Sequence, residues 1–319
     1  MKIHFTPKDF LRLFKLAASA AMARDIKPIL QNVKIIADTR YGAILTATDT
    51  TIGIRIRVDV DVSENGSALL PIKTLCTILN STTEKILTME SVMTVHDTGG
   101  TVEGESDNVN DDDDDYVPYT PQGQRSCSVV LYGQHERHEL CTIDPDEFPN
   151  IEEFTAEAYH ELEADDMTTL IQRTVFALDK DNLKYALGGV CFEEDHQNVT
   201  AVATDGRRLA VQTTDRCMIT GKPAIGTSRK KSFDDGTEQE YIDYPIVGIA
   251  ALNLLTKVLK DKSFKKQKRH VYSSTVKMVF DEQRVLFHCV STQGNKHALE
   301  LKFKHQTRRF YNDTCNSLS

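Results

Sequence analysis

Apolar positions recur at helical spacing near the N-terminus, which predicts an amphipathic helix that begins at Pro7. Thr6 occupies the N-cap position, Pro7 suits the first helical turn, and Asp9 completes a pattern similar to a capping box. The apolar stripe of this helix consists of Phe10, Leu11, Phe14, Ala17, Ala18 and Ala21. A second face carries basic residues at helical spacing, namely Lys8, Arg12 and Lys15.

Short runs of alternating apolar and polar residues follow this helix and predict β-strands. They lie at residues 32–36, 43–49 and 52–58, and the last run alternates with strict period two. A second helix is expected to begin at Leu70-Pro71-Ile72. Further strands are expected near residues 86–95 and 128–131. The first half of the chain therefore predicts an α+β arrangement.

The same order of elements returns later in the chain, which indicates an internal duplication. A helix capped by Asp165 or Asp166 is predicted up to Phe176, and the strand at 187–192 takes the place of residues 30–35. The second copy continues with strands at 200–205 and 209–211, a helix beginning at Tyr244-Pro245-Ile246, and strands at 276–280 and 285–287. The dipeptides Thr48-Asp49 and Thr204-Asp205 fix the register of the repeat. Chance similarity between two ordinary α+β segments is the alternative.

This repeat sets the expected domain organisation. Residues 1–150 form a first domain and residues 151–290 a second one, each with two helices packed on antiparallel sheets. Residues 148–151 are expected to form a linker strand between them. A smaller, loop-like insertion is expected at about residues 221–240, within the second domain. Residues 291–319 are expected to form an irregular or truncated tail.

The net charge of −9 is concentrated in one tract. Eight acidic residues and no basic residue lie between Glu103 and Asp115, so the rest of the chain is close to neutral. The tract belongs to residues 96–125, which lack apolar periodicity and are expected to form a disordered acidic insertion. A nearly neutral remainder can combine a basic and an acidic face, so it does not exclude a polyanionic partner.

The seven cysteines are odd in number and widely spaced, and no CxxC pair exists. This usage favours reduced, mostly buried thiols over a disulfide framework or a zinc site. No apolar run approaches the roughly 20 residues of a membrane helix, and the N-terminus lacks a secretory apolar region. We therefore expect a cytoplasmic protein without a metal or a cofactor.

No catalytic motif stands out, because the GxxxxGK[ST], GxSxG, HExxH and GxGxxG patterns are all absent. The segments 135–139 and 111–115 contain metal-ligating residue types, but their spacing favours a solvated polar loop and solvated charge. Asp205, beside Arg207 and Arg208, is better explained as a turn carboxylate than as a catalytic acid. A hydrolase or a nucleotide-binding enzyme is therefore disfavoured.

Basic side chains recur on the expected helix surfaces. They are Lys8, Arg12 and Lys15 in the first helix and Lys257 and Lys260 at the end of the later one. Each group alone is typical of a solvated face, whereas several groups in a nearly neutral chain favour a surface that tracks phosphates. Aromatic residues are not interleaved with these cations, which favours contact with a duplex backbone over single-strand or sequence-specific binding.

The segment from Ala201 to Val211, with the sequence AVATDGRRLAV, closely resembles the bacterial DNA sliding clamps. Those proteins are the beta subunits of the DNA polymerase III holoenzyme. The segments 24–33, 147–150, 173–177 and 185–190 are similar to the same family, and the likeness covers about residues 1–95 and 126–288. The resemblance implies the DNA-clamp fold, in which chains close head-to-tail into a ring. Helices then line the hole around duplex DNA, and sheets form the outside.

The resemblance also implies a processivity factor of DNA replication. Such a protein is an accessory subunit of a DNA-directed DNA polymerase and has no catalytic site of its own. It implies that Arg24 faces double-stranded DNA. It further implies a pocket for short peptides of the replicative polymerase, the clamp loader and repair proteins. The second-domain wall of that pocket matches Leu187, Thr204, Gly206, Arg207, Arg208 and Leu209. Arg207 occupies a position often taken by His in the family.

The chain departs from the family pattern after Cys289. About thirty residues follow, whereas a third domain needs roughly a hundred. In the family that domain supplies the other half of the peptide pocket and one ring interface. Ile246-Val247 also replaces a basic pair found in some members. The alternative function is therefore a truncated clamp-derived fragment or interaction module that forms no ring, although three two-domain chains could also build a six-domain ring.

Overall fold

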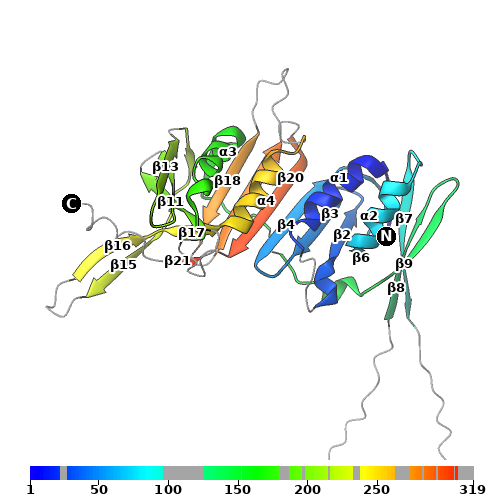
Figure 1. Ribbon diagram of the computed structural model, residues 1–319. Coiled ribbons are helices and arrows are strands. Elements are labelled where there is room, and N and C mark those ends of the chain that lie inside the picture. The colour runs from blue at the N-terminus through cyan, green and yellow to red at the C-terminus, as the bar shows by residue number, and fades with distance from the viewer. Residues whose placement is uncertain are drawn as a thin grey trace, which may run out of the picture.

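Two units with the same order of elements make up the protein (Figure 1). The computed structural model describes all residues except 22–26, 96–124, 152, 180–186, 196–197, 215, 233–237, 263–273, 282–283, 292–293, 305 and 308–319. Arg24 and almost all of the acidic insertion at 96–125 therefore lie outside the described residues.

The first unit begins with a strand and a helix and ends with an antiparallel strand pair. Its elements are β1 (Lys2–Phe5), α1 (Pro7–Ala18), the 3-10 turn η1 (Pro28–Gln31), β2 (Asn32–Asp38), β3 (Gly42–Thr48), β4 (Ile52–Val58), β5 (Asp61–Glu64), β6 (Gly66–Pro71), α2 (Ile72–Ser81), β7 (Leu87–Val95), β8 (Arg125–Tyr132) and β9 (Arg137–Thr142). Thr6 is the N-cap of α1 as the sequence predicts, but its side chain makes no capping hydrogen bond.

The second unit follows a 3-10 turn, η2 (Pro145–Glu147), and repeats this order with one insertion. Its elements are β10 (Tyr159–Glu163), α3 (Ala164–Gln172), η3 (Val175–Ala177), β11 (Gly189–Asp195), β12 (Asn198–Thr204), β13 (Leu209–Thr214), β14 (Met218–Thr220), β15 (Thr227–Ser232), β16 (Glu238–Asp243), β17 (Pro245–Gly248), α4 (Ile249–Leu259), β18 (Thr275–Phe280), β19 (Arg284–Ser291), β20 (Gly294–Lys304) and β21 (Gln306–Thr307).

The strand order shows the duplication directly. One sheet of the first unit has the order β5-β1-β7-β8-β9, and the second unit repeats it as β14-β10-β18-β19-β20. The remaining strands of the first unit pair in the order β4-β3-β2-β6, and the second unit repeats this order as β13-β12-β11-β17. Each described strand of the first unit therefore has a counterpart in the second, and the pairing registers identify counterpart residues.

The two units share one long sheet. β20 of the second unit pairs antiparallel with β4 of the first. This pairing joins a five-stranded layer of the second unit to a four-stranded layer of the first in one nine-stranded sheet. Figure 1 shows these two strands side by side, with the four helices on one side of the sheets. Strand pairing across the joint satisfies backbone groups that would otherwise be exposed at two sheet edges.

Apolar side chains of the helices pack against the inner faces of the sheets. On α1, Phe10, Leu13, Phe14 and Ala17 are buried, and the ring of Phe10 lies 4.3 Å from that of Phe5 on β1. Burial of each large apolar side chain stabilises the fold by roughly 1.5–3 kcal/mol. From Ile54 to Val58, buried and partly exposed positions alternate along β4, as the strict period that predicts this strand requires.

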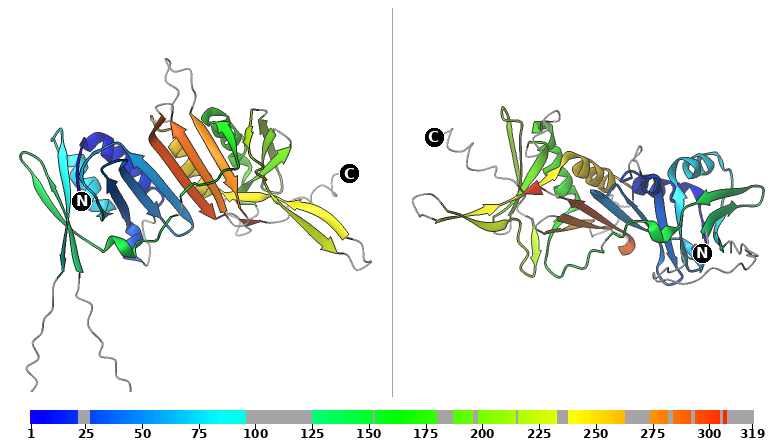
Figure 2. Two further views of the ribbon diagram at one scale, coloured as in Figure 1. Left: turned by 180° about the vertical axis from the view of Figure 1, so that it is seen from behind. Right: turned by 90° about the horizontal axis from the view of Figure 1, so that it is seen from below.

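An extended segment after η2 crosses the sheet on the side opposite the helices and covers the joint (Figure 2, left). Ile151 of this segment lies directly against Gly53, where an added Cβ would come within 2.9 Å of its Cδ1 atom. Arg55 donates to the carbonyl oxygen of Ile151 at 3.2 Å and pairs with Glu153 at 2.5 Å. The Nε atom of Arg55 also lies 3.6 Å from Glu300 of β20, so one cation, with 12% of its side chain exposed, connects both units.

The carboxyl group of Glu300 predicts a pH dependence of this joint. Burial raises its pKa, but His288, Arg55 and a backbone hydrogen bond from Phe154 outweigh burial and hold the pKa below the ordinary value. Stability from a lowered pKa is present above the ordinary carboxyl pKa of about 4.3 and is lost as the pH falls through the lowered value. We expect Glu300→Gln to lower the melting temperature at neutral pH and to flatten its acid dependence, as followed by thermal melts from pH 7 to 3. Parallel curves for the two proteins would refute this role.

Several expectations from the sequence are wrong. No helix begins at Tyr244-Pro245-Ile246: Pro245 starts strand β17, and α4 begins at Ile249. The registers make Gly248, not Pro245, the counterpart of Pro71, because each lies opposite the first residue of its neighbouring strand. Ile246 and Val247 are buried in this strand, so they belong to the core.

Three further segments differ from expectation. Residues 148–151 join no sheet and form the extended segment over the joint. The insertion near 221–240 contains the paired hairpin β15–β16, not a loop alone. The stretch from residue 291, expected to be irregular, contains β20, whose pairing with both β19 and β4 provides partners for its backbone.

The described cysteines, Cys76, Cys127, Cys141, Cys191, Cys217 and Cys289, carry free thiols. Four of them are buried, and burial raises the pKa of Cys217 to about 11, which makes it a poor nucleophile. Among the residues that the structure describes, no helix is long and apolar enough to cross a membrane.

Candidate functional site

The basic residues of α1 lie outside the apolar interior. Lys8 and Lys15 are exposed, and Arg12 is partly exposed, whereas the buried residues of this helix are apolar. Lys15 donates a hydrogen bond of 3.1 Å to the side-chain oxygen of Asn80, at the end of α2. Two cations of α1 are thus available at the helix surface.

Arg12 makes a contact that the sequence did not predict. Its guanidinium pairs with Asp261, just beyond α4, so it connects the helix layers of the two units. This ion pair lies on the helix side of the joint, and the pairing of Arg55 with Glu300 belongs to the sheet. Arg12 therefore has much of its charge compensated within the protein.

The second unit contributes basic side chains from α4 only at its end. Lys257 and Lys260 are exposed there. The helix α3, which corresponds to α1, begins with Asp165 and Asp166 and contains no basic residue. The structure caps α3 at Glu163, not at either aspartate. The helix layer is therefore basic on α1 and at the end of α4, and acidic at the start of α3.

The tight turn between β12 and β13 is held by its own side chains. Asp205 Oδ1 accepts hydrogen bonds from the backbone nitrogens of Arg207 and Arg208 at 2.9 and 2.7 Å. The Arg208 side chain donates to Oδ2 at 2.9 Å. These backbone and side-chain hydrogen bonds lower the pKa of Asp205 to about 2, so it remains a carboxylate. The prediction of a turn carboxylate is confirmed.

The first unit repeats this turn with one change. Asp49 Oδ1 accepts from the backbone nitrogens of Thr51 and Ile52 at 2.8 and 2.6 Å. The residue after the aspartate has a positive φ in both turns, +84° at Gly206 and +75° at Thr50. A β-branched residue pays a conformational cost there that glycine avoids.

This difference predicts that placing glycine at position 50 and removing it from position 206 have opposite effects on stability. Thr50→Gly is expected to stabilise the protein by roughly 0.5–1 kcal/mol, because strain relief exceeds the added freedom of the unfolded chain. Gly206→Ala is expected to cost about 1 kcal/mol through φ alone, since an added Cβ would meet no atom within 4 Å. Melting temperatures of both variants check the signs. A loss of stability in Thr50→Gly would contradict the strain argument.

The residues predicted to form a peptide pocket cluster at this turn. Gly206, Arg207, Arg208 and Leu209 are exposed, and Thr204 and Leu187 are partly exposed. Leu209 is 67% exposed, unusually much for a leucine. Thr204 Oγ1 accepts from the nitrogen of Gly206 at 3.0 Å and donates to the oxygen of Arg208, so it orders the turn. The structure thus provides a rigid, basic turn with one exposed apolar side chain.

Sequence reasoning missed Val211, which is 56% exposed on the same face of β13 as Leu209. Its signal was the alternation of the strand, in which Ala210 is buried between Leu209 and Val211.

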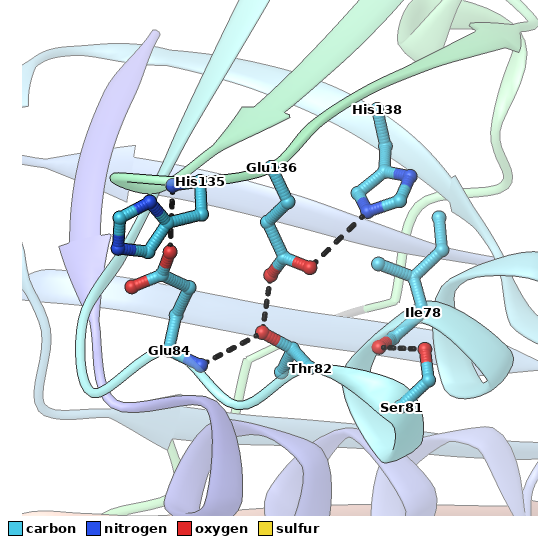
Figure 3. Close-up of polar contacts among 7 residues, drawn as sticks. All are labelled: Ile78, Ser81, Thr82, Glu84, His135, Glu136 and His138. Atoms are coloured by element: carbon cyan, nitrogen blue, oxygen red, sulfur yellow. Dashed lines mark hydrogen bonds and ion pairs between the residues drawn. The ribbon is translucent and has the colours of Figure 1, made fainter.

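The segment 135–139 forms a different structure from the predicted loop, because Arg137 already begins β9. Figure 3 shows Glu136 bonded to Thr82 and lying 3.5 Å from His138, while the nitrogen of His135 donates to Glu84. No cluster suited to a metal ion occurs in the described ranges.

Residues 161–220 match a family model described as the DNA polymerase III beta subunit, central domain. Two similar curated proteins are both named beta sliding clamp. The Vibrio cholerae protein is 37% identical over 83 residues, which cover 26% of this chain and 23% of that protein. The Pseudomonas aeruginosa protein is 24% identical over 216 residues, which cover 67% of this chain and 50% of that protein.

Solved structures show the same fold. The DNA polymerase III beta subunit from Pseudomonas aeruginosa superimposes with a TM-score of 0.68 at 18% identity, over 100% of this chain and 68% of that one. The sliding clamp from Bacillus subtilis gives the same TM-score and identity over 99% and 67%. In sequence and in fold, the chain is similar to the bacterial beta sliding clamps. The predicted α+β clamp fold is therefore confirmed, and the chain spans about half the length of the curated relatives that it matches over both units.

Proposed function

We propose that this chain is a processivity factor of DNA replication that holds a polymerase on duplex DNA and catalyses no reaction itself. The observation that carries the proposal is the one-sided arrangement of the two units, with exposed Lys8, Lys15, Lys257 and Lys260 on the helix layer. Cations on helices contact phosphates without reading bases, which permits sliding. Arg24 and Arg12 complete the proposed DNA-facing set, with Arg12 largely engaged by Asp261.

The proposal includes partner binding at the turn after β12. Leu187, Thr204, Gly206, Arg207, Arg208 and Leu209 would form one wall of a pocket for short peptides of the replicative polymerase, the clamp loader and repair proteins. The exposed Leu209 would supply apolar contact, and the two arginines would favour peptides with acidic residues nearby. The cytoplasm is the proposed location, because it contains DNA and such partners.

Encirclement requires further clamp units, because β9 and β13 end their sheets among the described residues. Self-association into a ring is the route implied by the family. The alternative is a truncated clamp-derived fragment or interaction module that is unable to form a ring.

The test is retention of the purified chain on nicked circular DNA compared with the same DNA made linear. Encirclement predicts retention on the circle at high salt and loss after linearisation, since a ring slides off free ends. Equal retention on both would indicate surface adhesion and would overturn encirclement. Sedimentation mass, measured on the same sample, distinguishes a ring of several copies from a single chain. A single chain without DNA retention would establish the alternative.

A further inference from the structure

A group of apolar side chains lies on the first unit, on the face of the sheet opposite the helices. The strand registers place Ile36 of β2 beside Ile44 of β3, and Ile44 beside Arg57 of β4. Because side chains alternate between the two faces of a strand and Ile35 is buried in the core, Ile36 points to the opposite face. Tyr41, in the turn between β2 and β3, has its ring centroid 5.9 Å from Cζ of Arg57. Ile36, Tyr41, Ile44 and Arg57 are called the Tyr41 patch.

The extended segment after η2, which crosses this face in Figure 2 (left), leaves the Tyr41 patch open. The segment contacts Arg55, whose guanidinium donates to the carbonyl oxygen of Ile151, and Thr46 beside Arg55 is only 6% exposed. One row further along the strands, Ile36 is 41% exposed, and Tyr41 in the adjoining turn is 61% exposed. Apolar surface of the patch therefore faces solvent among the described residues.

The fold itself does not require these apolar side chains, as the second unit shows. By the strand registers, the second-unit residues equivalent to the three strand positions of the patch are Glu193, Thr200 and Thr213. All three are polar, although the strands pair in the same order in both units. Single exposed apolar residues are ordinary on a protein surface, whereas a contiguous group that the fold does not need is typical of an interaction site.

Hydrogen bonds constrain the turn that carries Tyr41. Asp38 accepts from the backbone nitrogen of Arg40 at 2.7 Å through its carboxylate, and from that of Tyr41 at 3.3 Å through its backbone oxygen. The side-chain oxygen of Asn65 accepts from the backbone nitrogen of Thr39 at 2.8 Å. A partner that binds this ring therefore orders little additional chain, which favours affinity.

The charges around the Tyr41 patch indicate the chemistry of its partner. Arg40 is exposed in the turn, and Lys34 and Arg57 are partly exposed on the same face of the sheet. None of these three cations forms an ion pair within the part of the chain that the structure describes. The carboxylate of Asp38, the acid of this turn, is engaged by the backbone of Arg40. Carboxylates on a partner would therefore complement the surface.

We propose that the Tyr41 patch binds a segment of a partner protein in which apolar side chains are flanked by acidic residues. The apolar side chains of the segment cover Ile36, Tyr41 and Ile44, and tyrosine is a residue type that often dominates binding energy. The carboxylates of the segment pair with Arg40 and Arg57. This inference goes beyond the proposed function, because the patch lies opposite the proposed DNA-facing helices and in a different unit from the turn after β12.

The test uses a labelled peptide with this chemistry, DELFELD, and its charge-reversed form, KKLFKLK. By fluorescence anisotropy, the native protein should bind the acidic peptide about tenfold more tightly than the basic one. Tyr41→Ser removes the exposed ring, and Ile44→Thr introduces the residue type that the second unit has at this position. Each variant should weaken binding of the acidic peptide about tenfold.

Two control variants separate the Tyr41 patch from other apolar surfaces. Ile86→Thr is the match for Ile44→Thr, because Ile86 is 63% exposed elsewhere on the first unit, and it should leave binding unchanged. Leu209→Ser alters the turn proposed to bind partner peptides and should also leave binding of DELFELD unchanged. The two proposals can therefore fail independently.

Several outcomes would overturn the proposal. They are absent binding of the acidic peptide, equal binding of the two peptides, and equal losses in Ile44→Thr and Ile86→Thr. Loss of binding in Leu209→Ser with native affinity in Tyr41→Ser would place the peptide at the turn after β12 instead. A dimer in sedimentation that Tyr41→Ser dissociates would overturn the proposal in favour of self-association. Binding of duplex DNA that Tyr41→Ser abolishes would overturn it in favour of a nucleic acid.

Discussion

Replacing Glu194 by alanine is expected to destabilise the second unit by about 3 kcal/mol, because it leaves a buried imidazole ring and a backbone nitrogen without a polar partner. His160 is fully buried on β10, and its Nε2 atom lies 3.0 Å from Oε1 of Glu194 on β11. The alignment is too poor for a hydrogen bond, so the contact is electrostatic. Glu194 Oε2 also accepts from the backbone nitrogen of Ile225 at 3.1 Å. Loss of the Glu194 carboxylate would leave His160 Nε2 and the backbone nitrogen of Ile225 without this partner.

The first unit shows what the fold accepts at these positions. By the strand registers, the first-unit residue equivalent to His160 is Ile3, and the one equivalent to Glu194 is Ala37. Both Ile3 and Ala37 are buried apolar residues. We therefore expect the double variant His160→Ile with Glu194→Ala to recover most or all of the lost stability. Replacement of both members of a buried polar pair by apolar residues can be nearly neutral or stabilising.

Thermal melts check both expectations. A loss of about 3 kcal/mol corresponds to roughly 6–12 °C in a unit of this size. Glu153→Ala is the control, because Glu153 is an exposed partner of Arg55 and should cost less than about 1 kcal/mol. A single variant as stable as the native protein, or a double variant as unstable as the single one, would show that the pair contributes little.

Local sequence signals predicted local structure well. β4 follows from strict alternation, and the turns at Asp49 and Asp205 follow from side chains that bond to their own backbone. The prediction of a helix at Pro245 is wrong because proline suits both the first turn of a helix and the end of an edge strand. Only the pairing of β17 with β11 decides between these two structures.

Contacts between distant residues could not be predicted from one sequence. Nothing near Arg12 indicates that Asp261 would neutralise it, so its assignment to DNA rested on helix spacing alone. β20 did have a readable signal, the alternation of Leu299, Leu301 and Phe303 with polar residues. Residues 291–319 were expected to form an irregular tail because they are too few for a third domain, and the strand was therefore not predicted. The candidate site was predictable at the β12–β13 turn, where a specific motif exists, and less so on the helices.

Removal of the exposed lysines on the helices is expected to have a large effect on the salt dependence of DNA binding. Replacement of Lys8, Lys15, Lys257 and Lys260 by alanine is expected to make the dependence of log K on log salt less steep by about 3.6, because each phosphate contact contributes about 0.9. Arg12 is left unchanged because its loss would break the contact with Asp261. Binding to a duplex of fixed length, measured between 50 and 300 mM salt (about the range over which such slopes are resolved), gives this slope.

A second quadruple variant controls for net charge. Arg40, Lys85, Arg137 and Lys230 are exposed in turns and strands, and their replacement by alanine removes the same charge from outside the helices. If the helix layer faces DNA, this control keeps nearly the native slope, because long-range effects of net charge are screened within about 10 Å at 0.1 M salt. Equal changes in the two variants would mean that DNA meets the protein through no particular face, and the helix layer would then lose its proposed role.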